Sequence, residues 1–284
     1  MGGAWTDETL TNPHAVADKR QRVQRMFSAI AGSYDLNNRL HSFWRDQAWR
    51  RAAVKLAEVK PDDYVVDVAC GTGDLTLAFM AELTRIGNVS ALADHVIGID
   101  FTFQMLPFAQ QKWSQHPLQT EHRGEAFVPQ NLRQIVRFLN GDAQQLPLPN
   151  ACCDVVSIAF GIRNVQNVDA ALAEFFRVLR PGGRVVVLEF SEPTNPVLRF
   201  VNRLYCGRIM PYTATWISGD RSGAYKYLPK SVETFMSRQQ MQNHLETAGF
   251  GKIVQKPMTF GVCVAYRGVK VERPVPSPGN PGEG

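Results

Sequence analysis

The chain has 284 residues, of which 44% are hydrophobic and 20% charged, and it carries a net charge of +5. This length supports a large core without disulfides, and no apolar run approaches the roughly 18 residues of a membrane span, which excludes membrane-spanning, coiled-coil and collagen-like classes. The N-terminal residues lack a signal-peptide pattern, so we expect a cytoplasmic protein. The five cysteines form no C-x-x-C pair, so we expect neither a disulfide framework nor a metal site.

The positive charge is concentrated near the N-terminus. Residues 15–60 contain ten Lys or Arg and four Asp or Glu. A basic segment of this kind suits nucleic acid, an anionic lipid surface or an anionic substrate, and it also suits an ordinary solvated helix face.

Strands and helices are predicted to alternate along a single domain over residues 19–272. Residues 1–18 lack periodicity and residues 273–284 are rich in Pro and Gly, so we expect disordered tails there. Strands are expected at 64–69, 96–100, 136–139, 154–159 and 184–189, with helices at 74–84, 103–113 and 168–179. This alternation predicts an α/β fold with a parallel sheet covered on both faces.

The segments outside this alternation have a different character. Residues 196–248 are predicted to be mostly helical, and two further strands are expected at 252–255 and 262–267. Residues 114–134 are polar and lengthen the connection between the second and third strands, so we interpret them as a surface insertion.

A glycine loop follows the first predicted strand. The sequence from Val65 to Asp74 reads VVDVACGTGD, in which Gly71 and Gly73 let the backbone approach a ligand and the following helix offers free N–H groups to it. Thr76 stands at the sixth position of the G-x-G-x-x-G pattern, so the nicotinamide fingerprint is incomplete. The lysine of a P-loop is also absent from this loop.

Two carboxylates follow the next two strands. Asp100 ends the second strand, and Asp142 with Ala143 follows the third. Because carboxyl ends of parallel strands share one edge of a sheet, these groups are expected beside the glycine loop, where a carboxylate can accept both hydroxyls of a ribose.

This arrangement resembles a class I S-adenosylmethionine-dependent methyltransferase, which implies a Rossmann-like, seven-stranded, mostly parallel sheet. The resemblance implies that the loop of Gly71, Thr72 and Gly73 approaches the methionine part of the cofactor. It further implies that Asp100 binds the ribose and that Asp142 and Ala143 lie at the adenine end.

Further motifs resemble the ubiquinone/menaquinone biosynthesis C-methyltransferases over residues 23–270. They are the segment from Tyr34 to Trp49, F-G-x-R-N at Phe160–Asn164, R-V-L-R-P-G-G at Arg177–Gly183 and L-E-F-S at Leu188–Ser191. Five positions depart from the usual family residues: Asn37, His41, Asp46, Ala159 and Tyr266.

The family resemblance implies methylation of a ring carbon of a polyprenyl quinol, and we expect demethylmenaquinol first. Alternatives are a 2-methoxy-6-polyprenyl-1,4-benzoquinol, an oxygen or nitrogen acceptor of a small molecule, and a cofactor-binding protein without turnover. No N-P-P-[YF] motif or Pro-Cys nucleophile is present, so a nucleic-acid partner is not expected.

The resemblance also assigns catalytic residues. The ring carbon is a good nucleophile only when a neighbouring phenol is deprotonated, and a phenol titrates near pH ~10. Arg163 is expected to stabilise the phenolate, and Asn164 to hydrogen-bond either the second ring oxygen or a water. Tyr34 is expected to come from an N-terminal helical lid over residues 19–60.

A polyprenyl quinol resides in the bilayer, so we expect peripheral contact with an anionic membrane surface at the inner face of the cell membrane. The resemblance is also compatible with a homo-oligomer. The membrane contact is expected from basic and aromatic side chains of the N-terminal segment: Phe43, Trp44, Arg45, Trp49, Arg50 and Arg51.

Overall fold

A mixed sheet of seven strands forms the centre of the molecule. The computed structural model describes residues 5–87, 94–117, 136–220 and 222–271. The strand order is β3-β2-β1-β4-β5-β7-β6, and β7 is antiparallel to both of its neighbours. The strands are β1 (Val65–Val68), β2 (Val96–Asp100), β3 (Val136–Asn140), β4 (Cys153–Ala159), β5 (Leu179–Phe190), β6 (Phe250–Met258) and β7 (Cys263–Lys270). The predicted α/β class and seven-stranded, mostly parallel sheet are confirmed.

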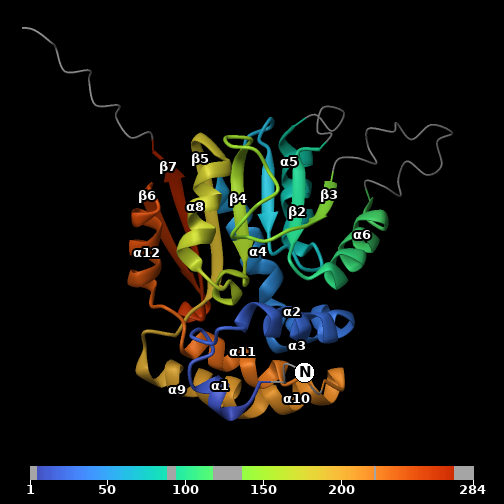
Figure 1. Cartoon of the computed structure of the whole chain (residues 1–284), viewed down its shortest axis with the longest axis vertical. Helices are drawn as coiled ribbons and strands as arrows, with labels where there is room; N and C mark the ends of the chain where they lie inside the picture. Colours follow the sequence, from blue (N-terminus) through green and yellow to red (C-terminus); the bar gives the residue numbers. More distant parts are fainter. Residues whose placement is uncertain (1–4, 88–93, 118–135, 221, 272–284) are drawn as a thin grey trace, which may run out of the picture.

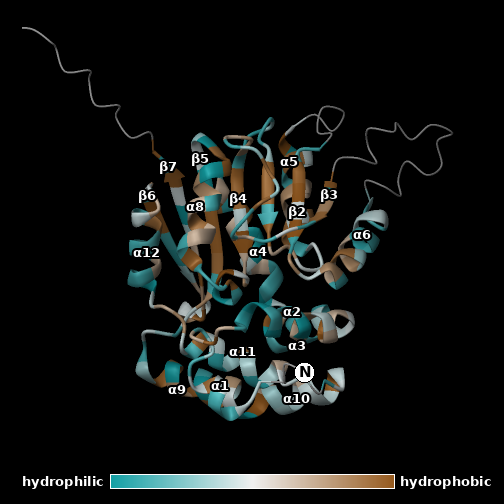
Figure 2. Ribbon diagram, viewed as in Figure 1, coloured by the Kyte–Doolittle hydropathy of each residue, from teal (hydrophilic) through white to brown (hydrophobic). Residues whose placement is uncertain are grey.

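Helices cover both faces of this sheet (Figure 1). One face packs against α4 (Arg45–Ala57), α5 (Asp74–Ile86) and α6 (Leu106–Ser114), and the other against α8 (Val168–Val178) and α12 (Arg238–Thr247). Strands buried on both sides read as continuous apolar runs. Figure 2 shows these hydrophobic strands between helices with mostly hydrophilic outer faces.

A polar residue lies inside the first strand. The buried carboxylate of Asp67 accepts hydrogen bonds from Thr76 Oγ1 at 2.7 Å and Ser157 Oγ at 2.8 Å. Burial raises the pKa of this carboxyl to about 6, and the two hydroxyl donors oppose the rise. The interaction joins β1 to α5 and β4 directly beneath the glycine loop.

A separate helical layer lies at the carboxyl ends of the parallel strands (Figure 1). It combines N-terminal and central segments and has its own core, which includes Met26, Ile30, Ala214 and Tyr227. Its helices are α1 (Asp7–Thr11), α2 (Lys19–Ile30), α3 (Tyr34–His41), α9 (Pro196–Leu204), α10 (Met210–Ser218) and α11 (Ala224–Glu233). Short turns are η1 (Ala31–Ser33), η3 (Phe103–Met105), η5 (Ile162–Asn164), the π-helical η6 (Tyr205–Ile209) and η7 (Thr259–Gly261).

The prediction of a disordered tail over residues 1–18 is wrong for its described part. The buried Trp5 stacks on Tyr227 with ring centroids 4.2 Å apart, and the Thr6 side chain caps α1. A single aromatic anchor and a five-residue helix leave no periodic pattern in the sequence, which explains the error. Residues 118–134 of the expected insertion and the expected tail at 273–284 lie outside the described residues.

Candidate active site

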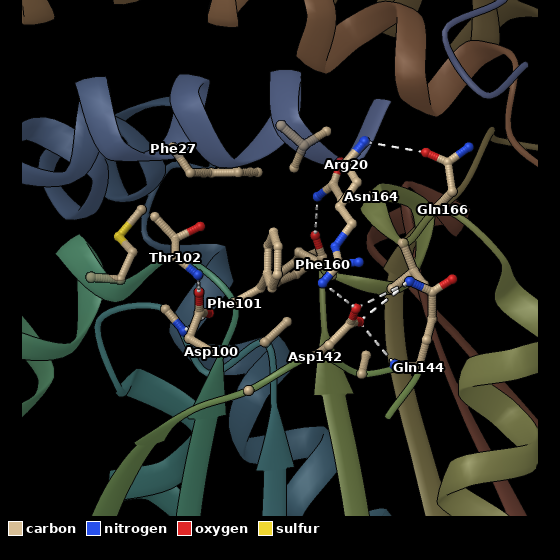
Figure 3. A pocket seen from close by; sticks show the side chains of 18 of the residues that line it. Arg20, Phe27, Asp100, Phe101, Thr102, Asp142, Gln144, Phe160, Asn164 and Gln166 are labelled. Atoms are coloured by element: carbon tan, nitrogen blue, oxygen red, sulfur yellow. Dashed lines mark hydrogen bonds and ion pairs between the residues drawn. The ribbon is translucent and has the colours of Figure 1, made fainter. Parts of the chain in front are cut away.

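Three cavities adjoin one another where the strands meet the helical layer. The first, of about 100 Å³, lies at the ends of β1 and β2 and beside the loop after β3 (Figure 3). The second, of about 290 Å³, lies between α3, α4 and the α9–α11 helices. The third, of about 20 Å³, lies against Gly71. Tyr34 lines all three cavities, so the segment from α2 to α3 forms a shared wall.

The first cavity brings together four of the expected cofactor residues: Gly71, Asp100, Asp142 and Ala143. The Asp100 carboxylate accepts the backbone N–H groups of Gly71 at 2.8 Å and Thr102 at 2.7 Å. Burial raises its pKa to about 6 against these donors. Each carboxylate oxygen keeps a further lone pair, so the held carboxylate can accept ribose hydroxyls.

Asp142 is engaged by a residue that the sequence did not single out. Arg20 Nη2 of α2 lies 2.8 Å from Asp142 Oδ2, and its guanidinium lies 4.4 Å from the centroid of the Phe101 ring. The backbone N–H of Gln144 donates to the other Asp142 oxygen at 3.0 Å. Figure 3 shows Arg20 extending from the helical layer to Asp142. A ligand that hydrogen-bonds this carboxylate must therefore displace or share Arg20.

Polar contacts fasten α2 over the first cavity. The buried ammonium of Lys19 donates to the Val165 carbonyl at 2.6 Å, and burial lowers its pKa to about 8. Gln24 Nε2 donates to the Phe101 carbonyl at 3.2 Å. These contacts place the amino-terminal part of the expected lid against the loops that follow β2 and β4.

The glycine loop is tied to the helical layer by charge. Thr72 Oγ1 donates to Asp35 Oδ1 at 2.6 Å, and Lys112 Nζ lies 2.7 Å from Asp35 and 2.6 Å from Asp74. Arg39 Nη1 lies 3.0 Å from Asp74 at the start of α5. Burial alone would raise the pKa of Asp74, but the surrounding cations hold it well below its usual range. Asp74 is therefore a permanent anion that joins α3, α5 and α6.

Two members of the predicted loop serve different purposes. Thr72 lines the third cavity, and its hydroxyl is directed to Asp35. Gly73 has a φ of 84°, and a Cβ there would lie 3.1 Å from Ala109 Cβ. Gly73 is thus required by its left-handed backbone and by its packing against α6, which no other residue type satisfies as well.

Arg163 lines the second cavity from η5. It is only 3% exposed, and its Nη1 lies 2.5 Å from Glu189 Oε1 and donates to the Phe160 carbonyl at 2.8 Å. Its Nε donates to Ser231 Oγ at 3.3 Å. Burial raises the pKa of Glu189, and the adjacent guanidinium opposes that rise. Arg163 is therefore a fixed cation with an internal counter-charge.

Asn164 lies on the side of the first cavity, away from the position expected for it. Its Nδ2 donates to the Phe160 carbonyl at 3.2 Å, and its Oδ1 accepts from the Tyr227 hydroxyl at 2.9 Å. It lines the first cavity and is not among the residues lining the second. The structure therefore places Asn164 and Arg163 at different cavities.

Tyr34 and Phe160 separate the first and second cavities. Burial raises the pKa of the Tyr34 hydroxyl, which keeps it protonated and able to donate a hydrogen bond at neutral pH. Phe160 has a φ of 58° at the end of β4 and lies 4.5 Å from Phe190 between ring centroids. These rings make the boundary between the cavities largely apolar.

The departures from the usual family residues have partners of their own. Asn37 Nδ2 donates to the Tyr225 hydroxyl at 2.8 Å, and Asp46 lies 3.1 Å from Arg39. His41 contacts the Asn37 carbonyl and Thr213 Oγ1, each at 2.9 Å. These contacts join α3 to α10 and α11, so the substituted residues contribute to the wall of the second cavity.

The residues around the first and third cavities fit an adenosyl amino-acid cofactor. Asp100 offers acceptors to a diol, and a Cβ at Gly71, which has a φ of 56°, would meet only Tyr34 Cε1, at 4.0 Å, among the described residues. At the end of the third cavity, buried Nε and Nη1 atoms of Arg50 have no hydrogen-bond acceptor among the described residues. A carboxylate-bearing ligand is chemically suited to an unpartnered, charged donor of this kind.

Known proteins are similar to this chain in sequence. A "Demethylmenaquinone methyltransferase" from Thermus thermophilus is 42% identical over 243 residues, which cover 86% of this chain and 99% of that protein. A "Ubiquinone/menaquinone biosynthesis C-methyltransferase UbiE" from Syntrophotalea carbinolica is 38% identical over 250 residues, covering 88% and 94%.

Solved structures agree in fold. A SAM-dependent methyltransferase from Aquifex aeolicus matches with a TM-score of 0.53 at 17% identity, covering 84% of this chain and 98% of that chain. A SAM-dependent methyltransferase from Thermotoga maritima matches with a TM-score of 0.55 at 20% identity, covering 87% and 99%. The sequence profile of the ubiE/COQ5 methyltransferase family matches residues 15–270. The chain therefore belongs to the ubiE/COQ5 methyltransferase family, and its cofactor is S-adenosylmethionine.

Proposed function

We propose that this enzyme methylates a ring carbon of a polyprenyl quinol, with demethylmenaquinol as its first substrate. The names of the Thermus and Syntrophotalea relatives support quinone C-methylation as the reaction class. The benzoquinol of ubiquinone synthesis remains the alternative acceptor, since the second of these names includes both pathways.

The observation that carries this proposal is the pair of cavities that share Tyr34 and Phe160. The first offers Asp100 and Asp142 to a nucleoside, while the second is larger and its wall includes Trp49 and Phe190. A donor and a flat aromatic acceptor bound on opposite sides of this boundary would be brought together without intervening water. S-adenosylmethionine, when bound, supplies a methyl group already activated by the sulfonium.

The residues of the chain must favour the deprotonated acceptor and orient it. A guanidinium stays charged at physiological pH and cannot serve as an ordinary base, so Arg163 would stabilise a ring oxygen as it loses its proton. Glu189 fixes the guanidinium in place through the 2.5 Å contact. Tyr34 would donate a hydrogen bond to acceptor or cofactor at the junction. Asn164 would act on the cofactor side.

The experiment is methyl transfer from labelled S-adenosylmethionine to chemically reduced demethylmenaquinol and, separately, to a 2-methoxy-6-polyprenyl-1,4-benzoquinol. A higher kcat/KM for labelling of the naphthoquinol than of the benzoquinol would support demethylmenaquinol as the substrate. A higher kcat/KM for the benzoquinol would instead support the substrate of ubiquinone synthesis. If neither quinol is labelled while S-adenosylhomocysteine binds, the quinol proposal is wrong. Label on oxygen or nitrogen would select another methyltransferase of this fold.

We also propose that an apolar stripe on α9 and α10 carries the membrane contact. Its side chains are exposed although they recur at helical spacing, as in Trp216 (86%) and Phe200 (68%). No helix among the described residues is long and apolar enough to cross a membrane. The α9–α10 stripe consists of Val197, Phe200, Val201, Leu204, Tyr212 and Trp216.

Charge and continuity favour an anionic bilayer as the occupant of the stripe. Arg208 is exposed within the same stretch, and Phe43, itself 72% exposed, lies 5.9 Å from Tyr205 between ring centroids. The opposite side of the stretch lines the second cavity, including Tyr205 and Met210. A lipid-borne acceptor would therefore have a short path from the surface to the cavity.

The α9–α10 stripe replaces part of the membrane contact that the sequence predicted in the N-terminal segment. Trp49 and Arg50 are buried, with 5% and 6% exposure, and so cannot face a bilayer. Phe43 and Trp44 are exposed, as are Arg45 and Arg51. Trp49 and Arg50 are buried because their helix, α4, packs against the sheet.

The test replaces Phe200 and Trp216 together by Glu and compares sedimentation with phosphatidylglycerol and phosphatidylcholine vesicles. Val254→Glu is the matched control, because Val254 is an exposed apolar residue on β6. The double variant should lose binding to the anionic vesicles while the control retains it. Unchanged vesicle binding, or a change only in the sedimentation coefficient of the free protein, would show that the stripe is not a lipid contact.

A further inference from the structure

Arg50 occupies an unusual place on α4. It is 6% exposed, and it lines both the second and the third cavities. Its guanidinium lies 5.2 Å from the centroid of the Phe160 ring, at the boundary between the cavities. The side chain thus extends from the sheet-covering helix into the centre of the site.

Two of the three guanidinium nitrogens of Arg50 have unmet hydrogen-bonding capacity among the described residues. Its Nε and Nη1 atoms are buried and have no acceptor among the described residues. The carboxylate nearest to it, Asp74, lies 3.7 Å from Nε, beyond hydrogen-bond range. Asp74 is already engaged by Arg39 at 3.0 Å and Lys112 at 2.6 Å. Burying a guanidinium whose donors lack acceptors costs stability, unless an anionic ligand accepts hydrogen bonds from those donors.

The third cavity shows which ligand group can reach these donors. It shares Tyr34, Ala69, Gly71 and Ala159 with the first cavity, so the two join at the glycine loop. Its volume of about 20 Å³ admits one small polar group. Arg50 and Gly71 both line it. A ligand whose sugar binds Asp100 would therefore project its other end toward Arg50.

We propose that Arg50 binds the α-carboxylate of the methionine part of the cofactor in the third cavity. This inference rests on the proposed methyl transfer, for which S-adenosylmethionine is the cofactor. Hydrogen bonds from a guanidinium to a carboxylate are charge-assisted, and each of the two unpartnered nitrogens of Arg50 offers a buried donor for one. The same contact would fix the methionine chain, and with it the sulfur, relative to Tyr34 and Phe160.

The test separates the carboxylate from the rest of the ligand. S-Adenosylhomocysteine carries the amino-acid end, whereas 5′-methylthioadenosine has the same nucleoside and sulfur but no carboxylate. Calorimetric titration of the full chain with both ligands is compared for wild type, Arg50→Gln, Arg50→Lys and Arg51→Gln. Arg51 is exposed on the same helix and serves as the matched control.

Arg50→Gln should weaken S-adenosylhomocysteine binding at least tenfold and change the Kd of 5′-methylthioadenosine less than twofold. Arg50→Lys should retain part of the lost affinity, and it keeps the test decisive if Arg50→Gln fails to fold. Arg51→Gln should alter neither Kd. The preference of wild type for S-adenosylhomocysteine over 5′-methylthioadenosine should shrink in both Arg50 variants.

Three results would overturn the assignment. Equal weakening of both ligands would make Arg50 a structural residue, and unchanged binding of both would leave it without a cofactor role. Unchanged binding together with a shifted pH profile of methyl transfer would assign Arg50 to the acceptor. If wild type itself binds neither ligand, the cofactor assignment fails, which is a different result from failure of Arg50 alone.

Discussion

The buried pair of Arg163 and Glu189 permits a decisive substitution. Arg163→Gln removes the cation that lines the second cavity and leaves Glu189 buried at 2% exposure without its 2.5 Å partner. Breaking a buried ion pair from one side costs about 3–5 kcal/mol. For a protein of this size, that loss corresponds to a fall in Tm of roughly 6–20 °C.

The loss of stability in Arg163→Gln should depend on pH in a defined direction. Burial raises the pKa of Glu189, and removal of the guanidinium raises it further. Between the unfolded pKa near ~4.3 and this higher folded pKa, the native state binds more protons than the unfolded state. The stability of Arg163→Gln should therefore fall as pH rises through that window.

A double variant separates structure from catalysis. Arg163→Gln with Glu189→Gln removes both charges, and replacing a buried pair by neutral groups often costs little stability. The double variant should recover most of the lost free energy of unfolding while methyl transfer stays about 10²–10³-fold below wild type, a loss typical of one removed electrostatic stabiliser. Arg85→Gln, in an exposed pair with Glu82, is the control and should change neither quantity.

The assays are urea unfolding across pH 5–9 and single-turnover methyl transfer at saturating cofactor. Near-wild-type transfer by the stable double variant would contradict a catalytic role for Arg163, because it would show that the acceptor needs no cation at this position. Failure of the second substitution to restore stability would show that the ion pair is not the main effect of Arg163 on folding.

Three further substitutions test other parts of the site and fold. Binding of S-adenosylhomocysteine to wild type should weaken as pH falls through about 6, because protonated Asp100 loses acceptor capacity. In the same titration, Asp100→Asn should bind this ligand weakly at every pH. Gly98→Ala should destabilise by about 1–3 kcal/mol in urea unfolding, since its Cβ would lie 2.7 Å from Phe138 Cδ1, and an unchanged midpoint contradicts this packing. Lys19 donates to the Val165 carbonyl and has a pKa lowered to about 8, so above that pH the unfolded state binds more protons than the native state. The free energy of unfolding of wild type should therefore rise from pH 8 to 10 relative to that of Lys19→Met. Parallel pH curves for the two proteins would contradict this prediction.

The sequence predicted the features that local patterning controls. Apolar runs located the strands, and Gly71, Asp100 and Asp142 could be placed together because parallel strands end at one edge of a sheet. The expected change to helices after Glu189 is also present in α9 to α12.

Contacts between distant segments were not predictable in the same way. Arg20 reaches Asp142, and Arg50 reaches the third cavity, only because α2 and α4 pack in particular orientations. In the sequence both arginines looked like members of one basic surface segment. Their isolated positive charges carry no pattern that distinguishes a rim residue from a buried one.

Roles taken from a motif also depend on side-chain direction. Arg163 and Asn164 are adjacent in the F-G-x-R-N segment, yet the 3₁₀ turn directs them to different cavities. Gly73, in the glycine loop, is explained by its backbone and by packing against Ala109. Sequence spacing thus located the site but did not assign each residue to donor or acceptor.

The most direct measurement is the position of a ¹³C-labelled methyl group in the product formed from demethylmenaquinol by wild-type enzyme. We expect a methyl carbon bonded to a ring carbon, and we expect saturating S-adenosylhomocysteine to abolish formation of this product. A methoxy product, or an unlabelled quinol after incubation with enzyme that binds S-adenosylhomocysteine, would contradict the proposal that the second cavity holds a quinol for ring methylation.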